Sequence, residues 1–132
     1  LGLAAARAEL VQAMNAGSSL LGFVGHSAPA QWTFDPLFRA TDVATLAANA
    51  NQPLVLQFGC WTTYYVSPQA NTMAHRLLLT PARGAAAVFG AAVLMDQASH
   101  DRMAAALAPV LIPGQRLGDA IQLAREKLPI EL

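Results

Sequence analysis

Two side chains of this sequence have the types and positions that nucleophilic chemistry needs. Cys60 is the only cysteine and directly follows the apolar stretch PLVLQFG, and His26 follows the apolar stretch SLLGFVG. A thiol is a good nucleophile as a thiolate, and a neighbouring imidazole favours that form and protonates a leaving amine. A lone cysteine is, however, most often a small core hydrophobe. The chemistry therefore depends on whether the fold brings His26 and Cys60 together.

The pattern of apolar runs predicts the elements that position these residues. Short continuous apolar runs, which are typical of strands buried on both faces, lie at 19–24, 54–58 and 84–90. Helices are expected at 3–16, 41–49, 72–79, 101–110 and 117–128. Strands that alternate with helices, joined by connections too long for hairpins, predict an α/β fold with a parallel sheet and helices on its faces.

In such a sheet His26 and Cys60 follow the carboxyl ends of the first two strands, where open parallel sheets bind ligands. A right-handed crossover places those strands side by side or nearly so. Gly25 and Gly59 suit a sharp exit from each strand and leave room for a substrate backbone. The backbone N–H groups of Cys60 and Ser27 then point into one space, where they hold a developing oxyanion.

Composition excludes several other classes of function. The 132 residues fit one domain, 1–132, and 55% hydrophobic against 12% charged residues argues against disorder. Eight basic and eight acidic residues are scattered singly, so neither nucleic acid nor an anionic membrane surface is an expected partner. No apolar run reaches the roughly 18 residues of a membrane-spanning helix. His75 and His100 are expected on helix surfaces, and no metal or other cofactor is expected because no His, Cys or carboxylate pair has ligand spacing.

Other residues near the strand ends are candidates for substrate contact. Four aromatic side chains either line a substrate groove or pack over the rim of the sheet: Trp32, Trp61, Tyr64 and Tyr65. Asp96 and Asp101 flank the exit of the third strand and are candidates for binding a basic substrate side chain. For Asp101, a role at the N-terminus of the following helix is the preferred interpretation.

The run from Leu20 to Leu128 resembles the catalytic core of the gingipain-type cysteine peptidases, which share the caspase-hemoglobinase fold. The matching segments occur in the family's order: NAGSSLLGFVGHSAPAQW, ATDVATLAANA, PLVLQFGCW, GAAAVFGAAV and LGDAIQLAREKL. The resemblance implies that His26 and Cys60 are the catalytic pair, that Ser27 supplies the second oxyanion donor, and that Trp32 is the family's loop tryptophan. The family usually has Gly at the position of Ser27, whose side chain is expected to crowd the oxyanion site or alter the backbone there.

The resemblance also implies a caspase-like, three-layer parallel sheet flanked by helices, of which this chain is the C-terminal half. The family's strands before the histidine strand have no counterpart here, and the chain opens at Leu1 without Met, so a piece of a longer polypeptide is expected. A three-stranded sheet leaves an edge unpaired. The missing half, another copy or another chain is expected to pair with it. The family resemblance alone implies a secreted or surface location.

The expected function is a cysteine endopeptidase that acts on peptide or protein substrates. Three alternatives stay open. One is the caspase-like domain of bacterial signalling and defence proteins, and another is an inactive scaffold or interaction module of a large surface protein, which Ser27 favours. The third is a small ligand-binding α/β domain, indicated if His26 and Cys60 lie at opposite ends of the sheet.

Overall fold

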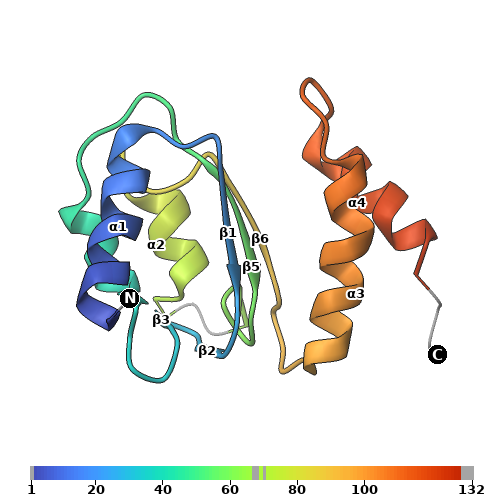
Figure 1. The fold of residues 1–132 in the computed structure, drawn as a ribbon, viewed down its shortest axis with the longest axis horizontal. Coiled ribbons are helices and arrows are strands. Elements are labelled where there is room, and N and C mark those ends of the chain that lie inside the picture. The colour runs from blue at the N-terminus through green and yellow to red at the C-terminus, as the bar shows by residue number, and fades with distance from the viewer. Residues whose placement is uncertain (1, 67–68, 70, 129–132) are drawn as a thin grey trace. The chain divides into compact units, whose positions relative to one another are not determined.

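A computed structural model of the chain describes residues 2–66, 69 and 71–128 (Figure 1). These residues form two compact units, Leu1–Met95 and Asp96–Leu132. The first unit contains every strand and both candidate catalytic residues. That the units make up one domain stays a prediction.

The central sheet of the first unit is parallel and has three strands in the order β1-β5-β6. They are β1 (Leu20–Val24), β5 (Leu54–Phe58) and β6 (Ala87–Gly90). The third strand begins later than expected because the chain is still turning at Gly84, which has a φ of 86°. The predicted parallel sheet and its crossover connections are confirmed.

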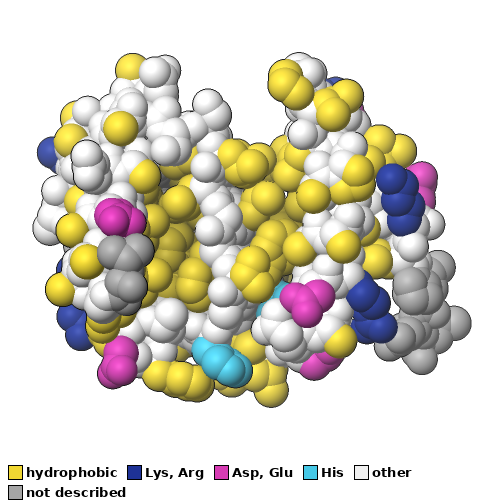
Figure 2. All heavy atoms as spheres, in the orientation of Figure 1, with side chains coloured by type: hydrophobic (Ala, Val, Ile, Leu, Met, Phe, Trp, Pro, Cys, Tyr) yellow, Lys and Arg dark blue, Asp and Glu magenta, His cyan; other side chains and the backbone are white. Residues whose placement is uncertain are grey.

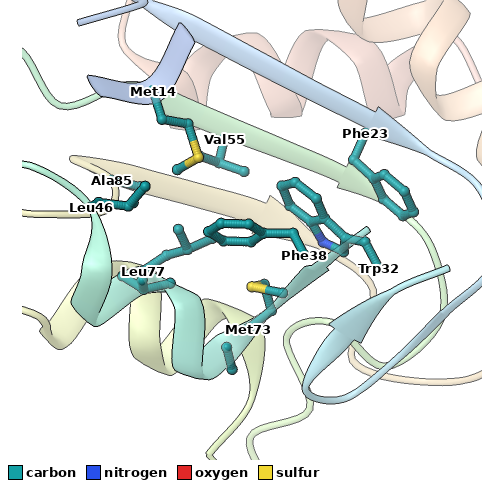
Figure 3. Close-up of a cluster of buried hydrophobic side chains, with 11 residues drawn as sticks. Met14, Phe23, Trp32, Phe38, Leu46, Val55, Met73, Leu77 and Ala85 are labelled. Atoms are coloured by element: carbon teal, nitrogen blue, oxygen red, sulfur yellow. The ribbon is translucent and has the colours of Figure 1, made fainter. Parts of the chain in front are cut away.

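Helices α1 (Leu3–Ala16) and α2 (Met73–Leu79) contribute to the buried core on one face of this sheet (Figure 1). Side chains alternate between the two faces of each strand, so Phe23 and Val55 point into that core. Figure 3 shows them with Met14 of α1 and Leu77 of α2. The expected α/β class, a parallel sheet flanked by helices, is confirmed.

A second, antiparallel sheet follows β1, where the sequence analysis expects only an irregular loop. It consists of β2 (Ser27–Ala28), β3 (Gln31–Trp32) and β4 (Phe38–Arg39). That expectation is wrong because Trp32 and Phe38 face each other across β3 and β4 and both are fully buried beneath the main sheet. Burying two aromatic rings stabilises strands that are too short to leave a periodic pattern.

The helix expected at 41–49 is only a 3-10 helix, η1 (Ala40–Thr45). The chain leaves it because Asn49 bonds elsewhere: its side-chain Nδ2 donates to the Met14 carbonyl and its N–H donates to the Ala82 carbonyl. These bonds fix the long connection that leads into β5.

The second unit contains α3 (Gln97–Leu107), η2 (Ala108–Val110) and α4 (Leu117–Glu126). Helix α3 begins four residues earlier than expected because Asp96 caps it, accepting a bond of 2.9 Å from the Ser99 N–H. Among the described residues no helix combines the length and hydropathy that crossing a bilayer takes. Charged side chains are scattered over the face in Figure 2 and form no large patch of one sign.

Candidate active site

The register of the main sheet sets the two candidate residues opposite each other. Strands β1 and β5 are parallel and pair from Leu20 with Leu54 to Val24 with Phe58. The pairing continues past the strands, since the Gly25 N–H donates to the Phe58 carbonyl over 3.1 Å. Carried two residues on, the same register brings His26 level with Cys60, at the carboxyl end of both strands. The alternative in which they lie at opposite ends is therefore wrong.

A side-chain hydrogen bond joins the two strand ends directly. The Ser27 hydroxyl donates to the Cys60 carbonyl over 2.8 Å, and this bond is partly buried. The space over Gly59 is consequently full: a Cβ at that position would lie 2.3 Å from Ser27 Oγ and 2.8 Å from the Gly25 carbonyl. The expectation that Gly59 leaves room for substrate is thus wrong at this residue, because the histidine strand occupies that room.

The small antiparallel sheet holds His26 from the other side. The Thr33 N–H donates to the His26 carbonyl over 2.8 Å, which anchors the histidine backbone to the chain just beyond β3. The imidazole is exposed and stacks on Phe34, with ring centroids 5.0 Å apart and an angle of 29° between the rings. Phe34 itself is 80% exposed. The histidine side chain is therefore accessible to solvent while its backbone is fixed.

The same ladder fixes the direction of the Ser27 N–H. The bond between Thr33 and His26 marks these two as a hydrogen-bonded pair, so the next pair, Ser27 with Trp32, is of the non-hydrogen-bonded kind. In such a pair each N–H points away from the partner strand. The Ser27 N–H is thus directed away from β3.

The segment after β6 contacts Cys60 from the opposite side. The half-buried Cys60 thiol donates to the Met95 carbonyl over 3.4 Å. Next to it, the Trp61 N–H donates to the Val93 carbonyl over 3.2 Å, and the Thr63 N–H donates to the Ala91 carbonyl over 3.0 Å. Cys60 therefore lies between two neighbouring segments, bonded through its carbonyl to one and through its thiol to the other.

The aromatic candidates divide between core and surface. Trp32 is 1% exposed and stacks on Phe23 with ring centroids 4.8 Å apart (Figure 3). Its indole N–H donates to Gln57 Oε1 over 2.8 Å. Trp32 therefore cannot line an open groove, and packing is the correct interpretation. Trp61, the residue after Cys60, is 38% exposed, and Tyr64 is half-buried, with its N–H bonded to the Trp61 carbonyl.

Sequence reasoning missed three apolar side chains near the site. Phe34 stacks on His26, and Val93 and Leu94 are 58% and 67% exposed in the segment that bonds to Trp61. The sequence signal that could have identified them is an apolar residue in a turn, where no helix or strand face would bury it. Tyr65 is also exposed, at 73%. Exposed apolar side chains therefore occur in the segments that bond to His26, Cys60 and Trp61.

The acidic candidates have structural roles in the second unit. Asp96 is the N-cap of α3, and bonds from the Ser99 hydroxyl and N–H lower the pKa of its carboxyl from its ordinary value. The preferred interpretation of Asp101 as the helix start is wrong because Asp96 takes that place, and Asp101 accepts a bond from Gln97.

The remaining histidines do not join Cys60 in any cluster. His75 is half-buried, whereas His100 is buried, so the surface expectation for His100 is wrong; its burial lowers the pKa of the imidazole. Within the described ranges, no group of three or more His, Cys, Asp or Glu side chains is placed to hold a metal ion.

Comparison with solved structures shows the fold of this chain. The crystal structure of the Arg-specific cysteine proteinase gingipain R matches with a TM-score of 0.72 and 16% identity, covering 89% of this chain and 29% of its own. The complex of the Porphyromonas gingivalis RgpB pro- and mature domains matches with a TM-score of 0.73 and 17% identity, covering 92% and 31%. A third structure, named only as a protease, has a TM-score of 0.60 and 20% identity, with 66% of this chain and 19% of its own covered. This chain therefore spans about 30% of the gingipain chains it matches.

Comparison of the sequence shows the family. None of the curated proteins matches this chain. The sequence profile of peptidase family C25 matches residues 2–130, almost the whole length. The expected resemblance is confirmed by both the profile and the fold. The chain belongs to peptidase family C25.

Proposed function

We propose that the protein containing this chain is a cysteine endopeptidase whose nucleophile is Cys60 and whose acid and base is His26. The observation that carries the proposal is the hydrogen bond between Ser27 Oγ and the Cys60 carbonyl, which ties the residue after the histidine to the nucleophile itself. Membership of family C25 supports the same assignment. Peptides or proteins are the substrates.

The reaction begins when His26 takes the thiol proton and the Cys60 sulfur turns from the Met95 carbonyl toward the scissile carbonyl carbon. The sulfur–carbon bond forms, and the N–H groups of Cys60 and Ser27 stabilise the negative oxygen that results. The carbon–nitrogen bond then breaks, and the imidazolium protonates the departing amine. Finally, His26 takes a proton from water as that water attacks the thioester carbon; the carbon–sulfur bond breaks, the acid is released, and the imidazolium returns its proton to the Cys60 sulfur.

Substituting Cys60→Ala tests the assignment. We expect the variant to lose all hydrolysis of a peptide substrate and all labelling by an electrophilic peptide inhibitor, with an unchanged circular dichroism spectrum. His26→Ala is expected to lose hydrolysis while keeping the thiol. Residual turnover by Cys60→Ala would refute the nucleophile.

A catalytically inactive interaction module is the second candidate. It is favoured by the stacking of Phe34 on His26 and by the bond that engages the Cys60 thiol in this structure. Alkylation of Cys60, the only cysteine in these 132 residues, by iodoacetamide separates the two candidates. Alkylation faster than that of a cysteine in an unfolded peptide indicates an activated thiolate, whereas a slower rate indicates the inactive module.

The edge of β1 is the proposed contact with the rest of the protein. Within the described residues β1 pairs only with β5, and Leu20 and Val24 are 53% and 57% exposed. We propose that the remaining half of the domain, or another chain, pairs with this edge. Amide hydrogen exchange of β1 tests this: protection in the whole protein at amides that do not face β5 is the expected result. A secreted or surface location is proposed from family membership alone.

A further inference from the structure

We propose that the Ser27 hydroxyl is a positioning group for the nucleophile, an inference that rests on the proposed function. Its bond to the Cys60 carbonyl fixes the backbone that carries both the thiol and one oxyanion donor. The family resemblance implies no such role, because it predicts Gly at this position and assigns only a backbone N–H to it.

The geometry directs the hydroxyl away from the space where an oxyanion would form. Ser27 Oγ lies 2.8 Å from the Cys60 carbonyl oxygen, so the hydroxyl proton is committed to that acceptor. The backbone N–H of Ser27 points away from β3, as the ladder alternation requires. Side chain and N–H therefore point to different groups: the hydroxyl holds the Cys60 carbonyl, and the N–H, which points away from β3, stays available for the proposed oxyanion.

The bond from the Ser27 hydroxyl also holds the two strands together beyond the point where their regular backbone pairing ends. Regular pairing between β1 and β5 ends at Val24 and Phe58, with one more bond from the Gly25 N–H. On the other side, Cys60 is held through its thiol, by the Met95 carbonyl. That second bond is lost whenever the sulfur turns to attack. During the reaction the bond from the Ser27 hydroxyl continues to tie Cys60 to the histidine strand.

Close packing at Gly59 shows that the chain accommodates this hydroxyl. Any side chain at Gly59 would displace it, since a Cβ there lies 2.3 Å from Ser27 Oγ. The buried glycine and the serine thus form a fitted pair between the two strand ends. If the hydroxyl only obstructed the oxyanion site, there would be no need for a glycine at position 59 to accommodate it.

The test compares Ser27→Ala, Ser27→Thr and Ser27→Gly with a matched control, Ser18→Ala. Ser18 also donates a partly buried bond to a backbone carbonyl, that of Ala13 over 3.0 Å, at the end of α1 where it precedes β1. Each variant of the whole protein is measured for kcat and KM on a peptide substrate, for the iodoacetamide alkylation rate of Cys60, and for Tm.

We expect Ser27→Ala to lower kcat by about tenfold, equivalent to about 1.4 kcal/mol, with KM changed less than about twofold. Alkylation is expected to slow as well, while Ser27→Thr, which keeps a hydroxyl, restores both rates. Ser18→Ala is expected to shift Tm by a similar amount without changing either rate. A more active Ser27→Gly variant would overturn the proposal, because it would show that the hydroxyl obstructs the oxyanion site.

Alkylation separates failure of this inference from failure of the proposed function. If the wild-type protein hydrolyses no peptide, the endopeptidase proposal fails, yet slower alkylation in Ser27→Ala, rescued by Ser27→Thr, still supports positioning. If the wild type is active and Ser27→Ala matches it in kcat and alkylation, the positioning role is refuted and the endopeptidase stands.

Discussion

Replacing Gly59 by alanine tests the close approach of the two strand ends. The added Cβ lies 2.3 Å from Ser27 Oγ, 2.8 Å from the Gly25 carbonyl oxygen and 3.1 Å from Phe23 Cε1. The hydroxyl can rotate away, but it then loses its bond to the Cys60 carbonyl, which costs about 1 kcal/mol. The Gly25 carbonyl belongs to the backbone and must move, and such overpacking costs about 1–3 kcal/mol. The free energy of unfolding is therefore expected to fall by about 3 kcal/mol.

Gly22→Ala is the matched control for this substitution. It adds the same methyl group within β1, and that Cβ meets nothing within 4 Å. Thermal unfolding followed by circular dichroism is expected to show Gly59→Ala lowered by on the order of 10 °C, with Gly22→Ala close to the wild type. In a Ser27→Ala background, Gly59→Ala is expected to cost less, because the nearest contact is gone. Equal Tm values for the two glycine variants would refute the reasoning.

Three further predictions concern the core, a helix cap and the surface near the thiol. Trp32→Phe is expected to cost about 3 kcal/mol in urea unfolding, because it leaves buried Gln57 Oε1 without its donor; a value under about 1 kcal/mol would contradict this. The pKa of Asp96 is lowered in the folded state, so its carboxylate stabilises the fold above the unfolded pKa and this stabilisation is lost as pH falls. The Tm advantage of wild type over Asp96→Asn should therefore shrink below about pH 4, and a constant difference would disprove the coupling. Trp61→Ala should raise KM for peptides more than it lowers kcat, which steady-state kinetics measures; an unchanged KM would remove Trp61 from the groove.

The main sheet was predictable because its strands are buried and apolar. Continuous apolar runs ending in glycine place β1 and β5 almost to the residue, and the crossover rule makes them neighbours. Their carboxyl ends carry His26 and Cys60, so the position of the candidate site in the fold also followed from the sequence. The register between β1 and β5 did not follow from the sequence, because a continuous apolar run is equally compatible with a pairing shifted along the strand.

The small antiparallel sheet was beyond the reach of pattern reasoning. Strands of two residues show no periodicity, and what stabilises them is the burial of Trp32 and Phe38 against Phe23, a contact with another strand. The helix start at Asp96 was missed for a different reason. The sequence offers two aspartates, Asp96 and Asp101, as possible N-caps of α3, and only the hydrogen bonds from Ser99 identify Asp96 as the cap.

Ser27 is the residue whose meaning changed most between sequence and structure. As a departure from glycine it argued for an obstructed oxyanion site, because a side chain was added where the family pattern has none. In the structure that side chain donates a hydrogen bond to the Cys60 carbonyl. It also explains why the preceding residue, Gly59, is a glycine, because a Cβ there would clash with the Ser27 hydroxyl. The two residues constrain each other: a larger residue at 59 excludes the hydroxyl, and without the hydroxyl the nearest reason for glycine at 59 is gone. Varying Ser27 and Gly59 singly and together therefore measures how strongly the two residues depend on each other.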